Sequence, residues 1–296
     1  MKRLVAIVVL VVGAFIVGAG LSRPLRLSAQ QLPNEPFRQF GTSVTGAFEG
    51  WFAAPDGTRY FLIGYLNRNN DQSVDVPIGP NNHIDPGGPD MGQPTHFLPG
   101  RQTGVFSITV PKTFSKDQKL TWTIVANGEP MTIPLRMNVD YNVSPFTGLE
   151  IGNTPPSLHL FEEKAAPAQG PVAFMSKAIA KTATVGSGLI IPVWAEDDAK
   201  YSSGTNAPMT TPRPPVSVSW AKYRGPGEVK FDNTKLEAIK GGKVDEPYLG
   251  KMTTTATFTD PGEYYLEITA NDYSGPGGGG EVCCWTTALV KVSVTQ

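Results

Sequence analysis

The sequence is poor in charge, histidine and cysteine. Charged residues make up 17% of its 296 residues, and Lys plus Arg (25) nearly balance Asp plus Glu (26). A chain without a basic excess lacks the electrostatic footprint of nucleic-acid binding, which excludes that class of partner. The sequence also lacks the G-x-S-x-G, H-E-x-x-H and Walker motifs of common enzymes. Its glycine run at 275–280 has no Lys or Ser/Thr to complete a phosphate-binding loop.

One long hydrophobic run is present, and it lies at the N-terminus. A basic Lys2-Arg3 pair precedes the uncharged segment 4–21, and residues 27–29 (Leu-Ser-Ala) resemble a signal-peptidase site. The run just reaches the length that spans a bilayer. We predict that residues 1–29 are either a cleaved signal peptide or an uncleaved membrane anchor. Both alternatives export the rest of the chain, to the periplasm, the cell surface or the medium, with membrane contact only through this segment.

Turn-forming residues are abundant. Gly (32) and Pro (27) are frequent, 40% of residues are hydrophobic, and no repeat of fixed short period is present. This composition favours many short strands joined by tight turns. The chain is also long enough for two ordinary hydrophobic cores. We predict an all-β protein with two β-sandwich domains, 36–151 and 172–296, joined by a semi-stiff linker over 152–171 that is rich in Pro and Ala.

The first predicted domain contains two patterns typical of β-hairpins. Pro55-Asp56-Gly57 separates two apolar runs; Pro sets the φ of the first turn position, and Gly accepts the positive φ that follows. Asn127-Gly128 separates two further runs and is the strongest short hairpin pattern. The strands predicted in this domain are 44–53, 59–67, 104–110, 120–126 and 131–135.

The second predicted domain is dominated by alternating segments. In 264–271, Tyr264, Leu266, Ile268 and Ala270 share one face, and more polar residues occupy the other. This period of two predicts a half-buried antiparallel strand. Trp220 lies on the third predicted strand, as a core Trp does in immunoglobulin domains. The strands predicted in this domain are 182–185, 189–195, 216–223, 228–231, 253–258, 263–271 and 285–294.

One motif links the second domain to a known family. The run 260–264 (Asp-Pro-Gly-Glu-Tyr), followed by Leu266, Ile268, Ala270 and Asp272, resembles the penultimate-strand motif of polycystic-kidney-disease (PKD) and related immunoglobulin-like domains. The resemblance covers about 171–296. It implies a seven-stranded Greek-key sandwich and an adhesion, spacer or carbohydrate-associated role. The first domain resembles, more loosely, the N-terminal part of exported bacterial proteins, on residues 49–52 and 92–94, and this likeness implies no activity.

A long irregular insert, 67–101, interrupts the first domain. Such loops are usually functional or disordered, and binding residues often lie in loops on a rigid scaffold. The insert contains His83, Asp85, Asp90 and His96. These residue types ligate zinc or copper, so the four form a candidate transition-metal site. The alternative is that they are solvated or bonded to nearby backbone.

Carboxylates end two strands of the second domain. Glu196, Asp197 and Asp198 follow one strand, and Asp272 follows another. In an immunoglobulin-like topology these strands run in the same direction on facing sheets, so we expect the acidic ends to meet at one pole. Converging carboxylates are ligands for Ca²⁺, and the four residues are a candidate calcium site. The alternative is that each Asp caps a turn by accepting nearby backbone N–H groups.

The two cysteines of the chain are adjacent. Cys283 and Cys284 follow the glycine run 277–280. Thiols of exported proteins meet an oxidising environment, which favours a disulfide. Neighbouring strand residues point apart, so a vicinal bond fits ordinary disulfide geometry poorly. We predict a vicinal disulfide; the alternatives are buried reduced thiols, bonds to another chain, or metal ligation.

These features predict binding or structural display rather than catalysis. A rigid sandwich presents loops, and function resides in those loops rather than in the fold. The expected partner is a carbohydrate or another surface protein, and no cofactor is expected apart from calcium. Trp51, Tyr60 and Tyr65 are candidates either for stacking on sugar rings or for core packing. The alternative function is an extracellular hydrolase or metal-dependent enzyme with its site in the insert 67–101, which requires a concave pocket with convergent titratable groups.

Overall fold

The computed structural model describes residues 35–54, 56–201, 213–276 and 283–296. The predicted export segment 1–29 and the glycine run 277–280 lie outside them. Residues Phe37–Gln296 form one compact unit. In the described part of the chain, no helix has both the length and the apolar character needed to cross a membrane.

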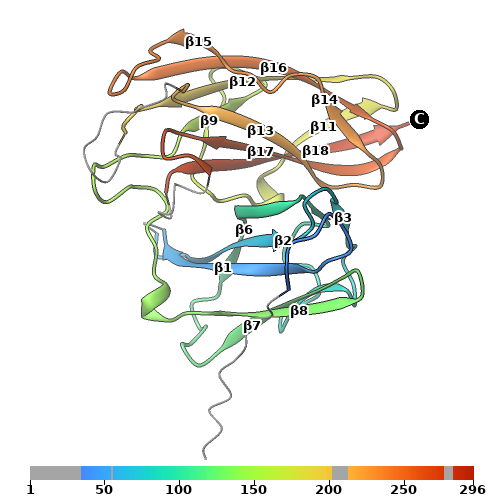
Figure 1. Ribbon diagram of the computed structural model, residues 1–296. Coiled ribbons are helices and arrows are strands. Elements are labelled where there is room, and N and C mark those ends of the chain that lie inside the picture. The colour runs from blue at the N-terminus through green and yellow to red at the C-terminus, as the bar shows by residue number, and fades with distance from the viewer. Residues whose placement is uncertain (1–34, 55, 202–212, 277–282) are drawn as a thin grey trace, which may run out of the picture. The chain divides into compact units, whose positions relative to one another are not determined.

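The fold is all-β, which confirms the fold class expected from composition. The described residues include two single 3₁₀ turns, η1 (Val139–Tyr141) and η2 (Met175–Lys177). The strands group into an N-terminal half, β1 to β8, and a C-terminal half, β9 to β18 (Figure 1).

The N-terminal half is built from two three-stranded sheets and a short two-stranded ribbon. Both predicted hairpins are confirmed, because β1 pairs with β2 and β7 pairs with β8, each antiparallel. At the second turn Asn127 and Gly128 adopt φ of 53° and 83°, as the Asn-Gly pattern requires. One sheet holds β1 (Val44–Ala53), β2 (Arg59–Asn67) and β6 (Gly100–Val110), the other β4 (Asn82–Asp85), β7 (Lys119–Ala126) and β8 (Glu129–Arg136), and the ribbon β3 (Val74–Asp75) and β5 (His96–Phe97).

The core of the N-terminal half lies between its two sheets. Phe61 and Phe106 come from one sheet and Trp122 from the other, and all three are buried. Because the Trp122 indole is buried, its N–H needs a partner, and Nε1 donates to Asn82 Oδ1 at 3.0 Å. Alternating apolar residues on β2, β6 and β7 thus face one another across the sandwich.

The C-terminal half has the strand order of an immunoglobulin domain. One sheet runs β10-β9-β12-β16-β14, with β15 on β16, and the other runs β11-β18-β17-β13. The orders β9-β12-β16-β14 and β18-β17-β13 correspond to the A-B-E-D and G-F-C strands of that fold. The strands are β9 (Ser157–Leu160), β10 (Ala168–Gln169), β11 (Ile179–Thr184), β12 (Leu189–Asp197), β13 (Ser217–Arg224), β14 (Val229–Phe231), β15 (Glu237–Lys240), β16 (Tyr248–Phe258), β17 (Gly262–Asn271) and β18 (Trp285–Thr295).

Tyr264 explains the motif at 260–264. Its hydroxyl donates to Asp260 O at 2.8 Å and accepts from Gly227 N at 3.0 Å. Immunoglobulin-like domains commonly contain a Tyr near the start of this strand whose hydroxyl bonds to backbone a few residues upstream, at the turn before the strand. The other expected core aromatic, Trp220, is only partly buried and stacks on Phe231 with centroids 5.4 Å apart.

The segment 152–171 differs from the linker expected there. It contributes strands β9 and β10 to the larger sheet, and β9 pairs antiparallel with β12. Leu158 and Leu160 alternate along β9 and are both buried in the C-terminal core. Two apolar residues on one face are enough to attach a short strand to an existing sheet, so the Pro-rich flanks mark the ends of strands. The boundary between two domains stays a prediction.

Strand β17 has one fully buried face, as a half-buried strand should, and its second face is partly covered: Tyr265 is buried, Glu267 and Thr269 are partly exposed, and Glu263 is exposed. Leu266 and Ile268 face the C-terminal core, while Tyr265 belongs to the core cluster of the N-terminal half, as does Leu289 of β18. Figure 1 shows the sheet of β13, β17 and β18 between the larger C-terminal sheet and the strands β2 and β6. The N-terminal half therefore covers part of a face that alternation alone assigns to solvent.

The insert 67–101 packs against the C-terminal half instead of forming a free loop. Thr95 N donates to Tyr223 O at 3.2 Å. Arg224 contacts both carboxylate oxygens of Asp90 at 2.9 Å and donates to Gln93 O from Nε at 2.9 Å. These bonds join the insert to β13, so its polar side chains serve the contact between the two halves.

Candidate functional site

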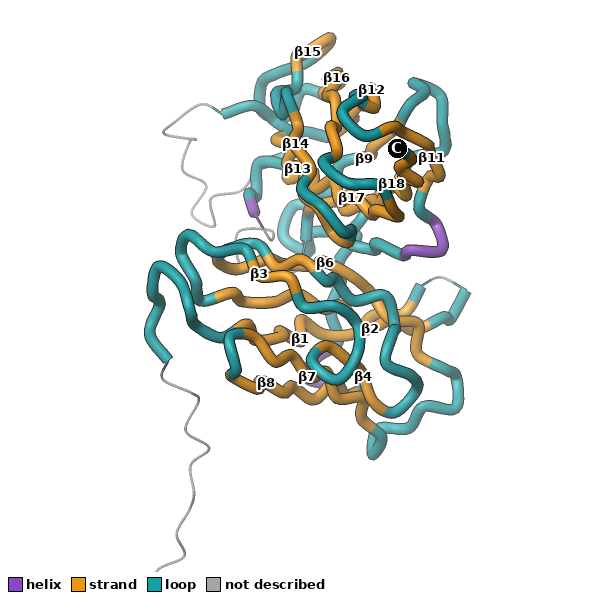
Figure 2. Tube along the Cα trace, turned by 90° about the vertical axis from the view of Figure 1, so that its right-hand side faces the viewer, coloured by secondary structure: helices purple, strands orange, loops and turns teal. Residues whose placement is uncertain are grey.

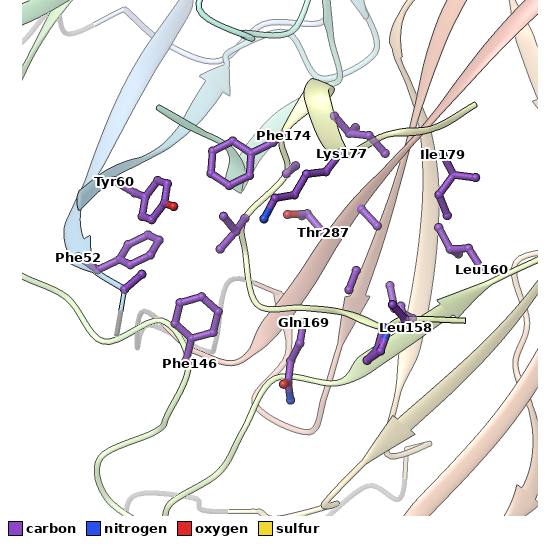
Figure 3. A pocket seen from close by; sticks show the side chains of 18 residues that line it. Phe52, Tyr60, Phe146, Leu158, Leu160, Gln169, Phe174, Lys177, Ile179 and Thr287 are labelled. Carbon is purple, nitrogen blue, oxygen red and sulfur yellow. The ribbon is translucent and has the colours of Figure 1, made fainter. Parts of the chain in front are cut away.

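A cavity of about 500 Å³, the junction cavity, opens between strands β1 and β2 on one side and β9, β10 and β18 on the other (Figure 3). Both halves of the chain contribute to its walls. It forms because the segment 166–179 crosses from β10 to β11 along the edge of the contact between the halves (Figure 2).

One wall of the cavity is aromatic. Phe52 stacks on Tyr60 with centroids 5.2 Å apart and meets the edge of Phe146 at 5.6 Å. Tyr60 in turn contacts Phe174 at 5.4 Å. The four rings therefore form a continuous surface. They come from two strands and two loops, which is why no short sequence pattern identified them.

The opposite wall is aliphatic. Leu158 and Leu160 of β9 are buried, as are Ala288 and Leu289 of β18, and Ile179 of β11 completes this side. These residues also belong to, or pack against, the hydrophobic cores. The cavity thus continues the apolar interior outward to the surface.

Besides the Tyr60 hydroxyl, three polar side chains line the cavity, and two of them have protein partners. The Gln169 amide donates to Pro155 O at 2.9 Å, and Thr287 Oγ1 lies 3.5 Å from Gly104 O. Lys177 is exposed, with Nζ 5.4 Å from the Phe174 centroid, and its amine points into the cavity (Figure 3). Within the described ranges, no carboxylate lies within 4 Å of Lys177 Nζ. The arrangement suits an apolar ligand with a charge at one end.

Three of the four predicted calcium ligands converge, as the topology predicts. Asp197, Asp198 and Asp272, the acidic pole, lie close enough for their charges to interact. Burial raises the pKa of Asp197 to about 8, and the neighbouring Asp272 and Asp198 carboxylates add to the rise. Burial likewise raises the pKa of Asp272. Glu196 does not join them, because its exposed carboxylate faces His159 at 4.0 Å.

Turn capping accounts for much of the acidic pole. Asp197 Oδ2 accepts Ala199 N–H at 2.7 Å, and Asp272 Oδ1 accepts Ser274 N–H at 2.8 Å. Among the described side chains, no group of three or more His, Cys, Asp or Glu is arranged to hold a metal ion. Near these carboxylates, Asp197 Oδ1 and Asn153 Oδ1 are buried and have no hydrogen-bond partner among the described residues. Calcium binding stays a prediction.

Cys283 and Cys284 are joined by a disulfide across a cis peptide bond. Both side chains are buried beside the acidic pole. Cys284 N donates to Ser274 Oγ at 3.3 Å, and Cys284 Sγ lies 3.5 Å from Asn153 O. The oxidation state in the exported protein stays a prediction.

Of the four candidate transition-metal ligands of the insert, His83 and Asp85 contact each other, and His96 and Asp90 have partners outside the set. His83 Nε2 lies 3.3 Å from Asp85. His96 is buried and bonds Asp75 at 2.9 Å, while Asp90 is held by Arg224. The structure therefore does not bring this set together at one centre.

Of the three aromatic residues considered for sugar stacking, Tyr60 lines the junction cavity. Trp51 donates to Asn138 O at 2.6 Å, and Tyr65 is buried and accepts Leu98 N–H at 2.8 Å. Sequence reasoning also missed the buried carboxylates Glu49 and Glu267. Glu267 lies in an alternating pattern whose polar face is normally exposed, so the sequence carried no sign of its burial.

No family model matches the chain, and no curated protein matches its sequence. Among solved structures, it is similar to domains 4 and 5 of the S-layer protein SbsC, with 10% identity over 86% of this chain and 98% of that one and a TM-score of 0.24. It is also similar to a titin fragment, with 8% identity over 85% of this chain and 99% of that one and a TM-score of 0.23. A third similar structure is the D00-D0 domain of intimin, with 14% identity over 84% of this chain and 99% of that one and a TM-score of 0.22. At these TM-scores, the immunoglobulin-like assignment rests on the strand order of the C-terminal half.

Proposed function

We propose that the chain is an exported, non-enzymatic binding protein whose ligand occupies the junction cavity. The observation that carries the proposal is this cavity of about 500 Å³ with one aromatic and one aliphatic wall. Small-molecule sites typically enclose about 300–1,000 Å³, are mostly apolar, and carry a few placed polar groups. Export rests on residues 1–29, and the PKD-like motif at 260–264 is consistent with display outside the cell.

The chemistry of the cavity favours binding over catalysis. Tyr60 and Lys177 are the only ionisable residues among those that line it. General acid–base catalysis and glycoside hydrolysis need paired titratable groups within reach of one bond. A second cavity, of about 480 Å³, borders the insert, but Asp90, the one ionisable residue among its lining residues, is paired with Arg224. The hydrolase alternative in the insert is therefore less well supported.

The test uses an uncharged fluorescent probe, N-phenyl-1-naphthylamine, and the full chain expressed with its own N-terminus and freed of detergent. We expect saturable binding with a stoichiometry near one, because the proposed site is a single cavity. Ala54→Trp should abolish this binding by filling the cavity, since Ala54 lines it.

Ala53→Trp is the matched control, because Ala53 is exposed and adjacent strand residues point to opposite faces. It should bind the probe as the parent does. Absence of saturable binding, or equal binding by the two Trp variants, would overturn the proposed site.

A further inference from the structure

We infer that the junction cavity binds an anionic single-chain amphiphile, with its acidic group on Lys177 and its alkyl chain along Leu158, Leu160 and Leu289. The inference rests on the proposed function and names the ligand class of the same site. The amphiphile is a free monomer, such as a medium- or long-chain carboxylate.

The cavity changes from polar to apolar with depth. Lys177 is exposed at the mouth. By contrast, Leu158, Leu160 and Leu289 are only 1%, 4% and 4% exposed. A ligand that enters with its charge outermost therefore buries its chain against aliphatic side chains and the rings of Phe52 and Phe174. Each buried methylene contributes favourably to transfer from water, so affinity should increase with chain length.

The charge of the ligand follows from Lys177. Its ammonium points into the cavity and has no carboxylate partner among the residues that the structure describes. A carboxylate or phosphate on the ligand provides that partner through a charge-assisted hydrogen bond. A cationic head group is repelled, and a neutral one forms only an ordinary hydrogen bond.

The same lining disfavours sugars and polar peptides. These ligands need several free donors and acceptors, because buried polar groups without partners are costly. The Gln169 amide already donates to Pro155 O, and Thr287 Oγ1 lies near Gly104 O. The Tyr60 ring already contacts the rings of Phe52 and Phe174. An alkyl chain requires none of these groups.

The test is displacement of N-phenyl-1-naphthylamine by octanoate, decanoate and dodecanoate from the detergent-free full chain. We expect affinity to rise about tenfold for each two added methylenes until the cavity is filled. Dodecanol should bind about tenfold more weakly than dodecanoate, and dodecylamine more weakly still, because charge-assisted bonds are about twice as strong as neutral ones.

Lys177→Met should lower the dodecanoate affinity about tenfold more than it lowers the affinity for the uncharged probe, because only the dodecanoate loses a charged partner. Lys181→Met is the matched control, since Lys181 also contacts a ring, that of Phe161 at 4.0 Å, but does not line the cavity. Its dodecanoate affinity should equal that of the parent.

The outcomes distinguish failure of the proposed ligand class from failure of the proposed binding site. Equal displacement by dodecanol and dodecanoate, or an unchanged dodecanoate affinity in Lys177→Met, would refute the amphiphile while the probe still reports a binding site. Loss of probe binding in the parent chain would refute the proposed function itself. Flotation with phosphatidylglycerol vesicles separates a bilayer from a free monomer. We expect the parent chain and Lys177→Met to float with the vesicles to the same extent. Weaker flotation of Lys177→Met would show that Lys177 binds a membrane surface and would overturn the proposal of a free monomeric ligand.

Discussion

The two faces of strand β17 differ in chemistry and in how completely they are buried. The face toward the larger C-terminal sheet carries Leu266 and Ile268, each with 0% exposure. The face toward the N-terminal half carries Tyr265 and, two residues on, Glu267. The first face is an ordinary hydrophobic core, while the second seals an ionisable group between the halves. The contact between the halves therefore contains carboxyl groups whose charge depends on pH.

Glu267 shows how the second face differs. Its Oε2 atom is buried with no hydrogen-bond partner among the described residues, and burial raises its pKa to about 8. The buried hydroxyls of Tyr65 and Tyr223 interact with its charge. Glu49 lies in a related setting, with Arg101 at 2.7 Å and Gly104 N–H at 2.7 Å, and burial raises its pKa to about 7.

The largest effect is expected in the hydrophobic face. Leu266→Ala removes fully buried methyl groups from the C-terminal core and should lower the free energy of unfolding by about 2–5 kcal/mol in urea titrations. The control is Ile190→Ala, whose side chain is 63% exposed, with an expected change below about 0.5 kcal/mol. Equal losses in the two variants would contradict the assignment of this face to the core.

The pH dependence of stability tests the second face. The pKa of Glu267 is raised from 4.5 to about 8 on folding, so the folded state holds its proton more tightly than the unfolded state. The free energy of unfolding should therefore fall as pH rises from about 4.5 to about 8, by up to about 1.4 kcal/mol for each pH unit. Asp197 and Glu49 act in the same direction.

Glu267→Gln should remove the contribution of this residue to the pH dependence, so the free energy of unfolding should fall less steeply with pH. Relative to the parent, the variant should gain most stability near pH 8. Urea titrations at pH 5, 6.5 and 8 measure it. Glu237→Gln is the control, because Glu237 is exposed on β15. An unchanged slope in Glu267→Gln would mean that Glu267 is ionised in the folded protein.

A smaller effect is expected where the insert meets β13. Arg224→Ala removes the bidentate contact with Asp90 and the bond to Gln93 O, and should cost about 1–2 kcal/mol, since Asp90 is half-exposed. Limited proteolysis should show faster cleavage within 86–94. Arg136→Ala, at an exposed position on β8, should not change the cleavage rate. Equal cleavage rates in both variants would show that Arg224 does not hold the insert.

The disulfide should add little stability. A bond between adjacent residues closes a very short loop, so the entropic model assigns it about 1 kcal/mol. Intact mass measured after alkylation under non-reducing conditions should show no added label. Two labelled thiols would contradict the disulfide, and labelling after reduction is the control.

The smallest effect is expected at the acidic pole. Because backbone N–H groups already cap Asp197 and Asp272, we expect EDTA to leave the melting temperature unchanged and elemental analysis to find no stoichiometric metal. The calcium hypothesis predicts the opposite: one bound Ca²⁺ and a lower melting temperature in EDTA that Asp272→Asn abolishes. A matched titration with MgCl₂ controls for ionic strength.

Much of the fold was predictable because its causes are local. The Asn127-Gly128 turn and the alternation from Tyr264 to Ala270 depend on residues a few positions apart, and both were identified correctly. Strand β9 was missed because Leu158 and Leu160 lie among prolines and form only a short strand. The convergence of Asp197 with Asp272 was predictable because strand direction alone places them at one pole.

The candidate site was not predictable from the sequence. Phe52, Phe146 and the neighbouring residues Phe174 and Lys177 come from three distant parts of the chain, and each has an ordinary local pattern. They meet only because the segment 166–179 runs along the contact between the halves. Tyr60 was the one lining residue singled out beforehand, on its aromatic character alone.

By itself, the sequence determined which segments form strands and where the chain turns, because side-chain alternation and turn chemistry act over neighbouring residues. Only the tertiary structure decided what covers each strand. The same alternating face can meet water or another sheet, and the energy that selects between them comes from residues more than a hundred positions away. The burial of Glu267, the docking of the insert on Arg224 and the cavity beside Lys177 all follow from that one long-range contact.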